Sequence, residues 1–155
     1  MYSPTVISIN FVPNGIQPDM LFLSNSKRYL QLATKLNKEK HRIIATSNVS
    51  ETTTGAFEFK LNYSSLIDTS AEFIDHSMIM LMKVLIDCGV KKISLAAFDG
   101  YSAKNTNYYK RAMEYDFVKK KADYLNTYTK EFLQSVNNKV EVEFVTTSHY
   151  EDKEI

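Results

Sequence analysis

The sequence predicts a layered α/β domain built around a mostly parallel sheet. Short apolar runs, several of them rich in β-branched residues, recur along the chain and alternate with helical patterns. Small polar residues follow the ends of several of these runs. With 155 residues, of which 44% are hydrophobic and 24% charged, the chain is long enough for one domain with a real core.

Charge and residue usage exclude several classes of function. The net charge of +1 provides no electrostatic case for binding nucleic acid or an anionic membrane. No apolar run reaches the ~18 residues that a membrane span needs. The first ten residues lack a signal-peptide pattern, so we expect a cytoplasmic protein. Cys88 is the single cysteine, and we expect it to be packed as a small hydrophobe.

The first half of the chain contains the predicted strands of the sheet. Their ranges are 5–10, 20–23, 42–47 and a half-exposed edge strand over 57–61. Prolines and a glycine make 11–19 a loop. Ser26 is expected to cap a helix over 27–37, and 63–70 is expected to be a connector.

The stretch 73–102 is predicted to form the central helix and strand of the domain. Asp75 or Ser77 can cap a helix that Gly89 closes, and almost all residues between the cap and Gly89 are apolar, which predicts a buried helix. Three methionines on this helix are expected to fill the core: Met78, Met80 and Met82. The apolar run 93–97 is typical of a central strand covered on both faces.

The last third predicts a long helical stretch and a final strand. The helical pattern runs over 108–137, in one piece or two, and 140–145 alternates strictly, as an edge strand does. Five tyrosines either form an amphipathic packing face or stack on a base or sugar: Tyr108, Tyr109, Tyr115, Tyr124 and Tyr128. We expect one domain over 1–150 and a charged tail over 151–155.

The strand ends suggest a binding site. Polar residues follow four predicted strands: Asn10, Ser24 and Asn25, Ser47 and Asn48, and Asp99. The carboxyl ends of parallel strands meet at one edge of a sheet, where ligands bind. A rim of amides and hydroxyls there suits the hydroxyl groups of a sugar or nucleotide.

Three residues are candidates for chemistry, and each has a structural alternative. Asp99 can act as a base, bind ribose hydroxyls, or cap the following loop through an Asx turn. Tyr101 has the same alternatives, and His76 either enters a pocket or packs at the helix start. Lys27 and Arg28 either face an anionic ligand or form an exposed surface pair. The three histidines are widely separated and no HExxH or CxxC spacing occurs, so no metal site is expected.

Taken in order, these motifs resemble one bacterial family. The resemblance is seen at Asn10, the stretch 24–29, the stretch 47–48, the helix start at 76–77, and the run 89–102 with Asp99-Gly100-Tyr101-Ser102. The resemblance is to the Rossmann-like domain at the C-terminus of 4-hydroxy-2-oxovalerate aldolase-like (HMG-CoA lyase-like) proteins, which are often encoded with surface-polysaccharide genes. It implies a Rossmann-like three-layer sandwich, a lyase as the parent protein and a link to polysaccharide biosynthesis.

The layout is similar, more distantly, to bacterial sialyltransferases that use CMP-sialic acid and to archaeal-type pterin pyrophosphokinase-like domains. That similarity implies a nucleotide pocket lined by residues at the positions of Asn10, Ser77, Asp99 and Tyr101. The full set of predicted ligand-binding residues is Asn10, Ser24, Asn25, Ser47, Asn48, Ser77, Asp99, Gly100, Tyr101 and Ser102.

The chain departs from these families at its start. They have a strand and a phosphate-binding loop before the strand that matches 5–10, whereas the four glycines here form no such cluster. The chain is therefore either a piece of a longer protein, which we expect, or a short variant that lacks this loop. The strands 5–10 and 93–97 should then pair directly, or another chain should fill the gap between them.

Aldolase chemistry would lie outside this chain, because a (β/α)₈ barrel needs ~250 residues. We expect a non-catalytic accessory domain that binds a nucleotide or sugar ligand or mediates assembly, with the parent's aldolase barrel as partner and a homo-oligomer as a further possibility. The alternative is a nucleotide-sugar-dependent, sialyltransferase-like glycosyltransferase domain. No cofactor is required by either reading, although a nucleotide is a candidate ligand.

Overall fold

The computed structural model of this chain describes residues 3–36, 39–52, 57–108 and 114–151. The chain divides into two compact units, Met1–Val84 and Leu85–Ile155. The boundary falls within helix α2 (Ser77–Asp87). Both units combine parallel strands with helices, so the predicted Rossmann-like α/β fold class is confirmed.

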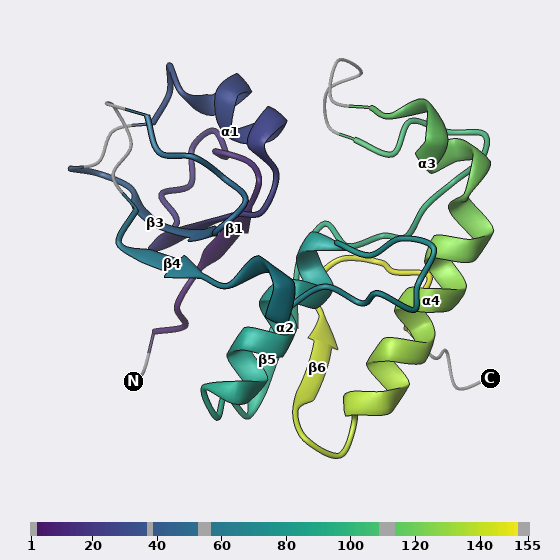
Figure 1. Cartoon of the computed structure of the whole chain (residues 1–155). Helices are drawn as coiled ribbons and strands as arrows, with labels where there is room; N and C mark the ends of the chain where they lie inside the picture. Colours follow the sequence, from purple (N-terminus) through teal and green to yellow (C-terminus); the bar gives the residue numbers. More distant parts are fainter. Residues whose placement is uncertain (1–2, 37–38, 53–56, 109–113, 152–155) are drawn as a thin grey trace. The chain divides into compact units, whose positions relative to one another are not determined.

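The first unit is built on a four-stranded parallel sheet (Figure 1). Its strands, in spatial order, are β1 (Ile7–Ile9), β2 (Met20–Leu23), β3 (Arg42–Thr46) and β4 (Phe59–Leu61). Each strand pairs in parallel with its neighbour, with Ser8 opposite Leu21 and Phe22 opposite Ile44. The four strands predicted in this half of the chain are confirmed, and β4 lies at an edge as expected.

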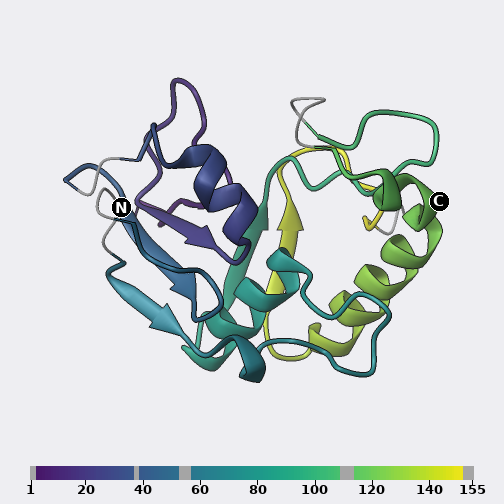
Figure 2. The same ribbon diagram turned by 45° about the horizontal axis from the view of Figure 1, so that its top comes forward.

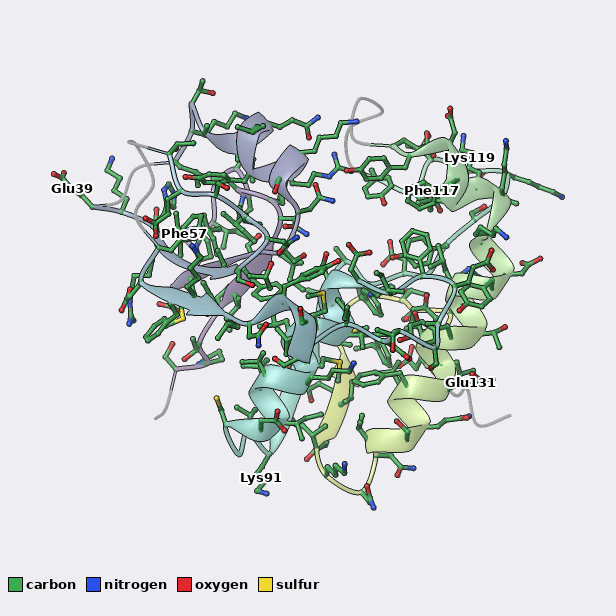
Figure 3. All side chains as sticks on the ribbon, viewed as in Figure 1. Glu39, Phe57, Lys91, Phe117, Lys119 and Glu131 are labelled. Carbon is green, nitrogen blue, oxygen red and sulfur yellow. The ribbon has the colours of Figure 1, made fainter. Side chains whose placement is uncertain are left out.

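The core of the first unit lies on the two middle strands. Leu21, Phe22 and Leu23 of β2 are all fully buried, which is typical of a parallel strand covered on both faces. Helix α1 (Ser26–Leu32) adds Tyr29 and Leu32 to one face. The ring of Phe57 packs edge-on against Tyr29, with ring centroids 5.3 Å apart (Figure 3).

Helix α1 begins at Ser26, one residue earlier than predicted. Asn25 is the N-cap, because its side chain accepts a 3.1 Å hydrogen bond from the Arg28 N–H, while the Ser26 hydroxyl donates to the Asn48 carbonyl instead. The helix ends at Leu32, so the expected extent to 37 is wrong. Arg28 is only 4% exposed and its Nη1 donates to Gln31, so an exposed pair with Lys27 is also wrong.

The buried helix is confirmed as α2, and it closes as predicted. Gly89 has a φ of +81°, and the next N–H, that of Val90, bonds to the Leu85 carbonyl at 3.0 Å. The three methionines are 4% exposed or less, which confirms their core role. The predicted caps are wrong, because Asp75 accepts from Tyr63 and the Ser77 hydroxyl bonds to other side chains. A short 3-10 turn, Tyr63–Ser65, precedes this region.

Cys88 lies just past the last residue of α2 and is exposed, so the expectation of a packed thiol is wrong. Full burial ends at Met82, about one turn before the end of the helix, although apolar residues continue to Ile86, and Asp87 is exposed. The run of apolar residues in the sequence did not show at which residue of the helix burial ends.

In the second unit, β5 (Lys92–Leu95) pairs in parallel with β6 (Glu141–Phe144), as Figure 2 shows. The expectation of a central strand covered on both faces is wrong, because Lys92 and Ser94 are exposed. Lys92 instead forms ion pairs with Glu141 and Glu143 at 3.0 and 2.7 Å on the solvent face. Ile93, which points to the other face, is 8% exposed.

The strands at 5–10 and 93–97, which were predicted to pair directly or to have the gap between them filled by another chain, lie in different units. In the first unit β1 pairs with β2, and in the second β5 pairs with β6. Direct pairing of β1 with β5, or pairing with another chain, stays a prediction.

The helical stretch of the last third forms two pieces, α3 (Asp116–Lys120) and α4 (Ala122–Val136). The predicted start at 108 is wrong for the residues described, since Tyr108 is not helical, and 109–113, including Tyr109, lie outside them. The buried positions of α4 recur every three to seven residues: Ala122, Leu125, Thr129 and Val136. Among the described helices, none has the length and apolar character to cross a membrane.

Candidate functional site

In the first unit, three residues predicted from separate parts of the sequence come together. Asn10 follows β1, Ser24 follows β2, and Ser77 begins α2. Asn10 Nδ2 donates to the Ser77 Oγ at 2.8 Å and to the Ser24 Oγ at 3.4 Å. The Ser24 hydroxyl also donates to Ser77 at 2.7 Å, and its N–H donates to Asn10 Oδ1 at 3.1 Å.

This polar cluster uses most of its own hydrogen-bonding groups. Asn10 has a φ of +52°, a left-handed conformation that Asn tolerates better than most residues. The two hydroxyls share one hydrogen between them, so one further hydroxyl hydrogen remains for an outside acceptor. Ser24 is only 2% exposed, and Ser77 is half-buried, so Ser77 is the accessible one.

The other predicted residues of the first unit are engaged in local structure. Asn25 caps α1, and Asn48 donates to the Ser24 carbonyl at 3.1 Å while accepting from Thr46 at 2.6 Å. The Ser47 hydroxyl accepts from the Tyr63 N–H at 3.1 Å. These side chains hold the strand ends in place, and their role in ligand binding stays a prediction.

His76 lies immediately before α2 and is 8% exposed. Burial lowers the pKa of its imidazole to about 4, because the charged form loses its hydration there. The imidazole is therefore neutral at physiological pH. A neutral, enclosed histidine is suited to packing or to accepting a proton only under acidic conditions.

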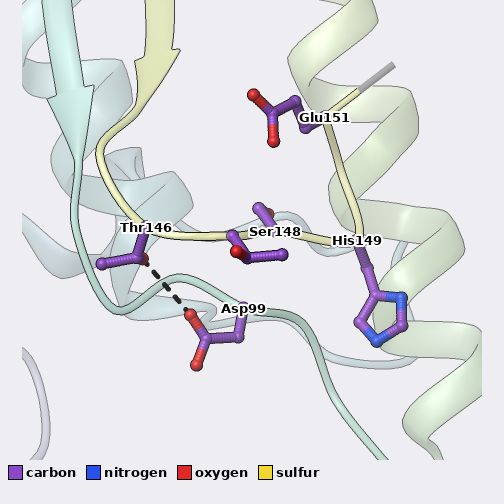
Figure 4. A pocket seen from close by; sticks show the side chains of 6 residues that line it. Asp99, Thr146, Ser148, His149 and Glu151 are labelled. Carbon is purple, nitrogen blue, oxygen red and sulfur yellow. Dashed lines mark hydrogen bonds between the residues drawn. The ribbon is translucent and has the colours of Figure 1, made fainter. Parts of the chain in front are cut away.

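In the second unit, Asp99 lies in the loop after β5 and is exposed to solvent. Its Oδ1 accepts a 3.3 Å hydrogen bond from the Thr146 hydroxyl, which in turn accepts from the Ala97 N–H at 2.8 Å (Figure 4). The Asp99 carbonyl accepts from the His149 N–H at 3.0 Å. No residue that the structure describes donates to Oδ2, so this oxygen faces solvent.

Asp99 lines an open hollow of about 710 Å³ with the loop that follows β6. The other lining residues are Thr146, Thr147, Ser148, His149 and Glu151. The hollow therefore lies beyond the carboxyl ends of two parallel strands, the usual place for ligands in such sheets. The sequence prediction missed the five residues after β6, although the run Thr-Thr-Ser-His follows a predicted strand as Asn10 and Asp99 do.

The other residues of the predicted motif, Gly100 to Ser102, stabilise the loop that follows β5. Gly100 has a φ of +99°, and a side chain there would meet the His149 ring at 3.0 Å. Asn126 of α4 clamps Tyr101 by accepting from its N–H and donating to its carbonyl, both at 2.8 Å. The Ser102 hydroxyl accepts from the N–H groups of Lys104 and Asn105.

Two tyrosines of this unit, Tyr101 and Tyr150, have raised pKa values. Burial raises the pKa of Tyr101, with Tyr108 and Tyr150 adding to the shift, and burial raises the pKa of Tyr150 to about 12. The Tyr150 hydroxyl donates to Asn126 at 2.8 Å. Tyr108 packs edge-on against Tyr115, and Tyr124 stacks on Tyr128, which favours the packing interpretation of this set.

Across the described ranges, no group of three or more histidine, cysteine or acidic side chains is arranged to hold a metal ion. Comparisons with known proteins found no match to this chain among family models, curated proteins or solved structures.

Proposed function

We propose that this chain is a non-catalytic accessory domain of a larger aldolase-like protein that binds a small hydroxylated ligand, such as a sugar or the ribose of a nucleotide. The resemblance in sequence supports the parent class. The hollow beside Asp99 supports the binding role, because it combines a carboxylate, an imidazole and hydroxyls on the loops after two parallel strands.

The single observation that carries this proposal is the state of the Asp99 carboxylate. Its Oδ1 accepts a hydrogen bond from Thr146, which orients the group, and the side chain is exposed and lines the hollow. A carboxylate oriented in this way can accept hydrogen bonds from a ligand hydroxyl. Asp99 therefore serves as the anchor of the proposed site.

The neighbouring hydroxyl favours binding over covalent chemistry. Ser148 precedes His149, but its hydroxyl donates to the Phe98 carbonyl at 2.7 Å and accepts from the Tyr150 N–H. A serine nucleophile needs its hydroxyl hydrogen-bonded to a base. Ser148 is instead 5% exposed and serves the loop structure.

A thermal-shift titration of the whole chain with a panel of sugars and with CMP, UMP and ATP tests the proposal. A ligand at 100 times its Kd should add roughly 2.7 kcal/mol of stability. We expect the shift to disappear in Asp99→Asn and to persist in Asp87→Asn, which removes the same charge from an exposed position at the end of α2. A shift that survives Asp99→Asn, or no shift with any compound, would contradict the proposal.

The alternative is a nucleotide-sugar-dependent glycosyltransferase domain. The proximity of Asp99 to His149 favours it, since a carboxylate or imidazole can act as the base that activates an acceptor hydroxyl. Release of CMP from CMP-sialic acid, lost in Asp99→Asn and not in Asp87→Asn, would support this alternative over an accessory binding domain.

A further inference from the structure

The loop that joins β1 to β2 (Figure 1) contains Asn14, the only asparagine in the sequence that is followed by glycine. Asn14 and Gly15 are both exposed and form a bend in the middle of this loop. We propose that Asn14 is a site of spontaneous modification, at which the main-chain nitrogen of Gly15 displaces ammonia from the side-chain amide and water then converts Asn14 to aspartate or isoaspartate. This inference concerns the first unit and does not depend on the proposed function.

The reaction is an intramolecular substitution followed by hydrolysis. Hydroxide takes the Gly15 N–H proton, the nitrogen forms a bond to Cγ of Asn14, and the bond from Cγ to Nδ2 breaks. A water molecule returns a proton to the leaving nitrogen, which departs as ammonia. Water then opens the cyclic imide at Cγ to give aspartate, or at the main-chain carbonyl carbon of Asn14 to give isoaspartate. Both reacting groups belong to neighbouring residues, so no encounter between molecules is needed for the first step.

The first argument is the freedom of both reacting groups. Among the residues that the structure describes, none forms a hydrogen bond with the Asn14 side chain or with the Gly15 N–H. Gly15 has a φ of +77°, and a Cβ at this position would meet no described atom within 4 Å. Because glycine has no side chain, nothing on Gly15 itself blocks the approach of its nitrogen to Cγ. Ring closure therefore needs only rotations within two exposed residues.

The second argument is that the two ends of the loop are fixed. The Val6 N–H donates to the Asp19 carboxylate at 2.7 Å, and the Asp19 N–H donates back to the Val6 carbonyl at 2.9 Å. The Ser8 hydroxyl donates to the Phe11 carbonyl at 2.7 Å. A rotation at Asn14 leaves these contacts in place, so the reaction can proceed in the folded protein without opening the sheet.

Asn25 provides an internal comparison. It also precedes a small residue, Ser26, but its Oδ1 accepts a 3.1 Å hydrogen bond from the Arg28 N–H as the cap of α1. The Asn25 side chain must leave this cap before its Cγ can be attacked, and loss of the cap destabilises the helix. The folded structure therefore slows the reaction at Asn25 and leaves Asn14 as the favoured position.

The modification changes the charge of the chain. Aspartate and isoaspartate each add one negative charge to a formal net charge of +1, which brings the net charge to zero. A protein without net charge loses the electrostatic repulsion that opposes association. We therefore expect the modified chain to be separable by ion exchange and to associate more readily than the fresh protein.

The test is a time course of the whole chain at about pH 7 and about pH 9, followed by digestion under acidic conditions and mass spectrometry of the peptides. We expect the peptide that contains Asn14 to gain the mass added by exchange of NH2 for OH about tenfold faster than the peptide that contains Asn25. The rate should be higher at the higher pH, because hydroxide removes the Gly15 proton.

Two variants separate the chemistry of this position from a general effect of backbone strain. Gly15→Ala should slow the reaction at Asn14 by about tenfold, because the methyl group hinders the approach of the nitrogen. Gly89→Ala is the matched control and should leave the rate at Asn14 unchanged. Gly89 has a similar positive φ, +81°, and equally open surroundings, but it follows Cys88.

The same time course in urea tests the contribution of the fold. Unfolding should raise the rate at Asn25 more than the rate at Asn14, because only Asn25 is released from a hydrogen bond. Equal rates at the two asparagines in the folded protein would overturn the inference. An unchanged rate in Gly15→Ala, or an Asn14 that stays unmodified at the higher pH, would overturn it as well.

Discussion

The main-chain N–H of His149 donates a 3.0 Å hydrogen bond to the carbonyl of Asp99, which joins the loop after β5 to the loop after β6. The Thr146 hydroxyl adds a second connection by donating to the Asp99 carboxylate. Residues that lie some fifty positions apart in the sequence thereby form one wall of the hollow. The strength of these loop contacts can be measured through stability.

Gly100→Ala should destabilise the protein more than Gly89→Ala does. Both glycines have positive φ values, +99° and +81°, so both variants force alanine into a strained conformation that costs ~1 kcal/mol or more. A methyl group at Gly100 would also meet His149 at 3.0 Å, whereas one at Gly89 meets no described atom within 4 Å. Urea unfolding should show about 1 kcal/mol more loss for Gly100→Ala.

The two glycine variants control for each other, because they share the backbone strain and differ in the side-chain clash. Equal losses of unfolding free energy would mean that the His149 ring moves aside without cost. This part of the lining of the hollow would then be able to rearrange without loss of stability.

Ala97→Gly should stabilise the protein. Ala97 has a φ of +55°, and a left-handed residue with a Cβ costs ~1–2 kcal/mol. Glycine removes that strain but adds ~0.5–1 kcal/mol of chain entropy to the unfolded state. The difference predicts a gain of about 0.5 kcal/mol in the free energy of unfolding, measured by chemical denaturation.

Ala96→Gly is the matched control, since Ala96 is an exposed neighbour whose φ is not positive. It should lose stability, because only the entropy cost remains. A loss in Ala97→Gly of the same size would argue against strain at position 97.

His76 should make stability fall as the pH is lowered from about 6.5 to 4. Burial lowers the imidazole pKa in the folded protein to about 4, from an ordinary value of 6.5, so the unfolded chain binds the proton first. Above pH 6.5 the residue is neutral in both states and contributes no pH dependence. The loss across the window is on the order of 3 kcal/mol.

Unfolding free energies measured at several pH values would show this slope. His76→Gln should flatten the slope between pH 4 and 6.5. An unchanged slope in His76→Gln would place the acid sensitivity in the carboxylates of the protein.

Ser24→Ala and Ser77→Ala should be coupled in a double-mutant cycle. Each hydroxyl accepts from Asn10, and the two bond to each other at 2.7 Å, so either change alone leaves a partner unsatisfied at a cost of ~1–2 kcal/mol. The double variant should lose less than the sum of the single losses, by ~0.5–1 kcal/mol.

Ser135→Ala serves as the control for this cycle. Ser135 is an exposed residue of α4, and its hydroxyl bonds only to the nearby Phe132 carbonyl. Its effect should add to that of Ser77→Ala without coupling. Full additivity between Ser24→Ala and Ser77→Ala as well would mean that the three-residue cluster contributes nothing as a unit.

Local patterns were sufficient for most of the elements. The run that forms β2 is apolar throughout and β3 contains the apolar run Ile43 to Ala45, and the positions of both strands were predicted from these runs. Gly89 ends α2 as its conformational freedom suggests. The caps of α2 were predicted wrongly, because Asp75 and Ser77 both have suitable side chains but bond to tertiary partners instead.

Part of the candidate site could also be predicted from the sequence, and part of it could not. A polar residue after a parallel strand can be recognised along the chain, which is how Asp99 and Asn10 were selected. The loop after β6 has the same pattern, but nothing in the order of residues brings Thr146 to Asp99. That contact depends on β5 and β6 being neighbours, a pairing between segments almost fifty residues apart.

The sequence by itself determined the α/β class, most strand positions and the polar character of the strand ends, because these depend on short-range periodicity and turn chemistry. Only the tertiary structure decided that β5 pairs with β6 alone among the described strands, that Cys88 is exposed, and that Asp99 shares a hollow with His149. Strand neighbours and burial are set by the free energy of packing distant segments together, which no local pattern of residues contains.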